Sequence, residues 1–71
     1  MKIEVFKTNI HSTDQVRLLE DAIHHQLPES KINFDLDDCD RILRVVAPEI
    51  DPNQIIELAE EIGLEVETLP E

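Results

Sequence analysis

Apolar and polar residues alternate near the start of the chain, in residues 2–6. Ile3 and Val5 share one side of this segment, and Phe6 lies on the other side with the charged residues. A period of two residues is typical of a strand with one buried face. The pattern predicts a strand in which Ile3 and Val5 face the core and Phe6 faces outward.

Three later segments alternate in the same way and predict three more strands, in residues 31–37, 41–47 and 64–68. The side chains expected to face the core are Ile32, Phe34, Leu36, Leu43, Val45, Ala47, Leu64, Val66 and Thr68. Ile42, Arg44 and Val46 have the opposite parity. We therefore expect these three side chains on the outer face of the sheet.

Apolar residues recur at helical spacing in two other segments, which we expect to be amphipathic helices. The apolar stripe of the first, in residues 13–27, consists of Val16, Leu19, Ile23 and Leu27. The stripe of the second, which follows Asp51, consists of Ile55, Leu58, Ala59 and Ile62.

Residues at the helix ends support these boundaries. Ser12 is a favourable N-cap, and Gln15 completes the Ser-x-x-Gln form of a capping box. Asp51 is an N-cap followed by proline at the first helical position. Pro28 ends the first helix, and Gly63 stands where a glycine commonly ends a helix.

The elements follow the order βαββαβ, with the polar residues 37–40 forming a hairpin connection between the second and third strands. This order predicts an α+β, ferredoxin-like sandwich, in which two helices cover one face of a four-stranded antiparallel sheet. With 71 residues, we expect one domain, spanning residues 1–71.

The net charge of the chain limits the kinds of molecule that it is expected to bind. Six basic and seventeen acidic residues give a net charge of −11, which argues against binding nucleic acid or anionic membranes. Cys39 is the only cysteine, so a disulfide framework is excluded and a reducing, cytoplasmic location is expected. The sequence has no apolar run of about 18 residues, so we expect no membrane span.

The loop before the first helix, residues 7–12, reads Lys-Thr-Asn-Ile-His-Ser. The chain resembles the heavy-metal-associated domains of copper chaperones and metal-transporting ATPases in this loop and in two later segments. Residues 30–36 resemble the second strand of that family, and residues 60–66 resemble the end of its second helix and its fourth strand. In that family the loop reads Met-Thr-Cys-x-x-Cys, and two thiolates bind Cu(I) or another soft ion. The resemblance implies the same fold over nearly the whole chain.

The resemblance also aligns this loop with the metal-binding motif. Lys7 stands at the methionine position and Thr8 is retained, while Asn9 and Ser12 replace the two cysteines. Soft cations select thiolate ligands, which amide and hydroxyl oxygens do not replace. We therefore expect the fold without the metal, and no cofactor.

Other candidate ligands have simpler explanations. His11, with Asn9 or Asp14, can be a weak metal site, but one imidazole does not make a closed site. His24 and His25 are consecutive on a helix and point about 100° apart, so we expect them to face solvent. Cys39 stands among aspartates and belongs to no Cys/His constellation, which argues against a nucleophile.

The outer face of the sheet is the more promising surface. In this fold the first and third strands are central, so Phe6, Ile42 and Val46 are expected to converge there around Arg44. An apolar centre with a charged rim is typical of an interface. These four residues form the predicted interface, which a second copy or another protein can cover.

Three hypotheses about function remain. The first is a non-enzymatic interaction module that lacks the thiolate site and pairs through the open sheet face. The second is a divergent metal carrier that uses His11 and loop oxygens. The third is a small-molecule sensor resembling ACT-type regulatory domains. Because the sequence shows no nucleophile–base constellation and no phosphate-binding loop, we expect no enzyme.

Overall fold

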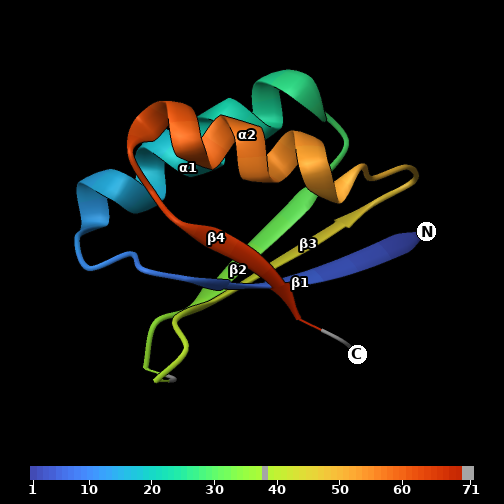
Figure 1. Ribbon diagram of the computed structural model, residues 1–71. Coiled ribbons are helices and arrows are strands. Elements are labelled where there is room, and N and C mark those ends of the chain that lie inside the picture. The colour runs from blue at the N-terminus through green and yellow to red at the C-terminus, as the bar shows by residue number, and fades with distance from the viewer. Residues whose placement is uncertain (38, 70–71) are drawn as a thin grey trace.

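Two helices lie side by side over one face of a four-stranded sheet in the computed structural model, which describes residues 1–37 and 39–69 (Figure 1). The elements are β1 (Lys2–Thr8), α1 (Thr13–Gln26), β2 (Lys31–Asp35), β3 (Ile42–Ala47), α2 (Pro52–Ile62) and β4 (Val66–Leu69). This βαββαβ order confirms the predicted ferredoxin-like architecture.

The strands pair antiparallel in the order β2-β3-β1-β4, so β1 and β3 are the central pair, as expected. β1 extends two residues beyond its predicted end. It stays paired with β4 as far as Thr8, whose register partner is Val66. β2 ends at Asp35, two residues early, because the chain turns there toward β3. Leu36, expected in the core, lies in this turn and is 39% exposed. Asp38, within the predicted hairpin connection, lies outside the described residues.

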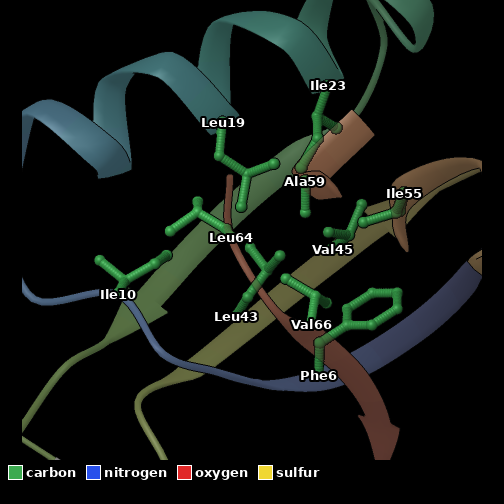
Figure 2. Close-up of a cluster of buried hydrophobic side chains, with 10 residues drawn as sticks. All are labelled: Phe6, Ile10, Leu19, Ile23, Leu43, Val45, Ile55, Ala59, Leu64 and Val66. Carbon is green, nitrogen blue, oxygen red and sulfur yellow. The ribbon is translucent and has the colours of Figure 1, made fainter. Parts of the chain in front are cut away.

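The core lies between the sheet and the helices (Figure 2). Its buried members are Phe6, Ile10, Leu19, Ile23, Leu43, Val45, Ile55, Ala59, Leu64 and Val66. They come from both helices, from three strands and from the segments next to them. Removing this apolar surface from water is the main force that holds the two layers together.

The structure corrects the predicted parity of β1. Phe6 is fully buried and pairs in register with the buried Leu43, so its ring points into the core beneath the helices and not into the predicted interface (Figure 2). Ile3 and Val5 lie on the opposite face, where Ile3 pairs with Val46. Both parities of this strand carry apolar residues, and the large aromatic ring is the one that gains most from burial.

Gly63 ends α2 with a left-handed backbone, at φ = 90°. Its N–H donates to the carbonyl of Glu60 at 3.0 Å, and the N–H of Leu64 donates to the carbonyl of Ala59 at 2.9 Å. This pair of bonds is a Schellman motif, and Leu64 adds the usual apolar contact by being buried. The predicted helix end is therefore confirmed.

Gly63→Val is expected to lower the free energy of unfolding by about 1–3 kcal/mol, because a β-branched residue is strained at positive φ. A Cβ at Gly63 meets no atom within 4 Å, so backbone strain is the whole cause. Gly63→Asn is the matched control and should cost less, since asparagine tolerates this conformation. Urea denaturation measures both, and equal midpoints for the two variants would contradict the argument.

Candidate functional site

The loop between β1 and α1, where the resemblance places a metal site, is held to the start of β4 by Asn9. The side-chain Oδ1 of Asn9 accepts a hydrogen bond from the Glu65 N–H at 2.9 Å. The Asn9 N–H donates to the Glu65 carbonyl at 3.2 Å. Asn9 therefore has a structural role that joins two segments far apart in the sequence.

Thr8 fixes the other side of the same loop. Its Oγ1 donates to the Arg41 carbonyl at 2.7 Å and accepts from the Ile10 N–H at 3.3 Å. The Thr8 N–H donates to the Asp40 carbonyl at 3.1 Å. Since Ile10 is also fully buried, the loop is anchored between the β2–β3 hairpin and the core.

Ser12 and Gln15 organise the helix start. Ser12 Oγ accepts from the Gln15 N–H at 3.3 Å, which confirms Ser12 as the N-cap. The Gln15 Oε1 accepts from the N–H of His11 at 2.9 Å, one residue before the N-cap. The expected capping box is thus present in a shifted form.

The candidate metal ligands are not brought together. Asn9 and Ser12 each use their side-chain oxygen for a backbone N–H, and His11 is exposed. Within residues 1–37 and 39–69, no group of three or more His, Cys, Asp or Glu side chains is placed to hold a metal ion. Cys39 is exposed in the hairpin segment.

Positive charge also lies at this end of the molecule. Arg41 lines a shallow hollow beside the loop together with His11 and Ser12. Lys7 lies near Asp40, with 3.9 Å between Nζ and Oδ1, and both side chains are about half exposed. A guanidinium at the hollow disfavours a bound cation.

The uncovered face of the sheet carries an apolar patch. The strand register places Ile42, Arg44 and Val46 on this face, as predicted, because their partners in β1 are Lys7, Val5 and Ile3. Leu69 pairs with Val5 and completes the face in β4. We define the open-face patch as Ile3, Val5, Ile42, Val46 and Leu69.

Exposure varies across the open-face patch. Ile3 is 49% exposed, whereas Ile42 is only 9% exposed. Ile42 lies between Lys7 of β1 and Asp35 of β2, whose side chains flank it on the same face. The alternation of residues 2–6 correctly separated Ile3 and Val5 from Phe6. The prediction nevertheless placed Ile3 and Val5 in the core, so they were missed as surface residues.

The charge of this face differs from that of the whole chain. Its basic side chains are Lys7, Lys31 and Arg44, and its acidic ones are Asp35 and Glu67. The described residues of the face therefore have one net positive charge, while the chain has a net charge of −11. Acidic groups are concentrated elsewhere.

The two helices of the described chain are too short and too polar to cross a membrane. No protein-family model matches the sequence. No curated protein matches it.

Among solved structures, the chain is similar to the yeast copper transporter domain CCC2A, whose solution structure was determined in the apo and Cu(I)-loaded states. The TM-score is 0.83 and the sequence identity is 12%, over 99% of this chain and 97% of that domain. This likeness shows that the two share a fold, which is the fold that the resemblance to heavy-metal-associated domains implies.

Proposed function

We propose that the chain is a non-enzymatic interaction module that has the fold of a heavy-metal-associated domain, lacks a thiolate metal site and associates through its open sheet face. The observation that carries this proposal is the open-face patch, because neither helix of the described chain covers that side of the sheet (Figure 1). The single exposed cysteine agrees with a reducing, cytoplasmic location.

The first hypothesis has more support than the metal carrier. A Cu(I) ion needs soft ligands, and the only cysteine, Cys39, is in the hairpin segment rather than in the loop. Asn9 and Ser12 accept backbone hydrogen bonds that hold β4 and cap α1. A metal bound through these two oxygens would compete with both structural bonds.

The favoured partner is a second copy of the chain. The open face carries side chains of both signs around apolar residues, so two such faces can oppose Lys7, Lys31 and Arg44 to Asp35 and Glu67. With strands about 4.8 Å apart and about 3.3 Å per residue, the face measures roughly 15 by 20 Å. Two such faces bury roughly 600 Å² together, which is below the range of stable specific interfaces, so the dimer is expected to be weak and transient.

The net charge provides a test of the kind of partner. Two chains of −11 repel each other, and added salt screens this repulsion. Self-association should therefore tighten as salt is raised. Complexes with a basic partner should loosen under the same conditions.

Ile3→Glu is expected to abolish self-association and leave the fold intact, because it places a charge at the most exposed member of the open-face patch. Leu18→Glu is the matched control, since Leu18 is 55% exposed on α1 and the substitution makes the same change in charge and size. Sedimentation at about 0.05 M and about 0.5 M salt measures the fraction of dimer under weak and strong screening of charge.

The two variants separate the possible results. Loss of the dimer with Ile3→Glu but not with Leu18→Glu supports the open face. Equal loss with both variants points to net charge alone and contradicts the proposal. A wild-type chain that stays monomeric at high salt and high concentration rules out self-pairing.

A further inference from the structure

The outer edge of β2 has no neighbouring strand among the described residues, because β2 stands at one end of the sheet. Two hydrogen bonds of β1 show which backbone groups point to that edge. The Thr8 N–H donates to the segment that leads into β3, and the Asn9 N–H donates to the segment that leads into β4. Backbone groups of successive residues alternate between the two edges of a strand. The register from β1 through β3 to β2 therefore places the N–H and C=O groups of Ile32 and Phe34 at the free edge.

The sequence of β2 is complementary to itself when it is read in the opposite direction. It reads Lys-Ile-Asn-Phe-Asp, with an exposed basic residue at one end and an exposed acidic residue at the other. In an antiparallel pair centred on Asn33, Lys31 lies opposite Asp35 of the second copy, and Ile32 lies opposite Phe34 of the second copy. Charged residues on an edge strand usually oppose pairing with another chain, but here they favour it in this one register.

Both faces of such a strand pair contain favourable contacts. Lys31 and Asp35 belong to the open face of the sheet, where the pair contains two contacts of opposite charge. Ile32 and Phe34 are only partly buried under the helices, and a second copy covers their remaining surface with the same two side chains. A parallel pair in register would instead place Lys31 beside Lys31 and Asp35 beside Asp35, which is unfavourable.

We propose that the free edge of β2 is a docking surface for the same edge of a second copy. The edge-facing groups of Ile32 and Phe34 lie opposite each other in this register, so the strand ladder continues from one copy to the next. Two four-stranded sheets become one sheet of eight strands, with both open-face patches on the same side. The pairing uses the edge of the sheet and not its face, so its failure leaves the proposed function unaffected.

The test uses a chain with Ile3→Glu, which is expected to remove open-face association and changes a residue of β1, separated from β2 by β3. A strand pair of five residues is a small interface, so we expect a dissociation constant on the order of 1 mM. About 15% of the chains are then paired at about 0.1 mM and about 60% at about 2 mM. Edge pairing therefore adds little at the lower concentrations at which open-face association is measured.

Exchange of backbone amides with water, measured by NMR on the ¹⁵N-labelled chain at both concentrations, reports the pairing directly. The N–H groups of Ile32 and Phe34 should exchange about twofold more slowly at the higher concentration, because the strand ladder covers them. The Thr68 N–H is the internal control. The register places it at the free edge of β4, on the other side of the sheet, and its exchange should not change.

Reversal of charge in the same Ile3→Glu chain tests the register. Lys31→Glu and Asp35→Lys should each weaken the pairing about fivefold or more, because each places like charges opposite one another twice. An equal mixture of the two variants restores both contacts of opposite charge and should recover the slow exchange. One change lowers the net charge by two and the other raises it by two, so the mixed pair has the same summed charge as two unmodified chains.

Glu67→Lys is the matched control for Asp35→Lys, since it makes the same change in charge on β4, away from the β2 edge. It should leave the pairing intact or strengthen it slightly, through lower repulsion between chains. Equal effects of Glu67→Lys and Asp35→Lys, or a mixture that fails to recover, would overturn the proposal. If a charge variant does not fold, the unmodified Ile3→Glu chain still decides, because exchange of Ile32 and Phe34 that is independent of concentration rules out edge pairing.

Discussion

Phe6→Ala is expected to lower the free energy of unfolding by about 3–5 kcal/mol, the range for truncating a buried aromatic side chain. Phe6 is fully buried and packs in the same cluster as Leu43 and Val45 (Figure 2). A domain of this length has a total stability of roughly 4–10 kcal/mol. The variant should therefore lose about a third or more of its total stability.

Ile3→Ala is the control for this prediction, because Ile3 lies on the same strand but is 49% exposed on the other face. It should change the free energy of unfolding by about 1 kcal/mol or less. Urea denaturation followed by circular dichroism measures both variants. A small effect of Phe6→Ala with a large effect of Ile3→Ala would restore the parity expected from the sequence.

Replacing Asn9 and Ser12 together by cysteine is expected to create a Cu(I) site. The resemblance places these two residues at the cysteine positions of the metal-binding loop, and two thiolates are the ligands that this ion prefers. The apo variant should be less stable than the wild type, because the bond from the Glu65 N–H to Asn9 and the N-cap of α1 are both lost. Loss of the N-cap alone costs about 1 kcal/mol.

Metal should then restore stability in the variant, since a ligand that binds only the folded state stabilises it. Cu(I) delivered in competition with a thiol chelator, with melting temperature as the readout, measures this gain. The wild-type chain should show no gain, and Ser12→Ala separates the loss of the cap from the gain of thiolates. If the wild type retained stoichiometric copper, the proposal that it lacks a metal site would be wrong.

The elements could be predicted because each is marked by local chemistry. The stripe that contains Leu19 and Ile23 defines α1, and Pro28 and Gly63 mark the helix ends close to where the structure has them. The parity of β1 could not be predicted in this way. Apolar residues stand on both sides of residues 2–6, so alternation alone does not say which side is covered by the helices.

Local sequence patterns also could not predict the roles of the loop residues. Asn9 bonds to Glu65, 56 positions later, and Thr8 bonds to Arg41, 33 positions later. These partners become neighbours only in the folded sheet. The burial of Ser30 could not be predicted for the same reason, because it depends on how the turn after α1 packs against the end of β3.

The strand order has a consequence for the chain as it is synthesised. β1 is made before the other strands, but its two neighbours are β3 and β4, the last two of the four to be made. One edge of β1 has no partner until residue 42 has emerged, and the other has none until residue 66. Unpaired strand edges promote aggregation, and like charges keep chains apart. Residues 1–41, which are made before β3, carry nine acidic and five basic residues, so we expect like-charge repulsion to oppose aggregation while the central strand waits for both partners.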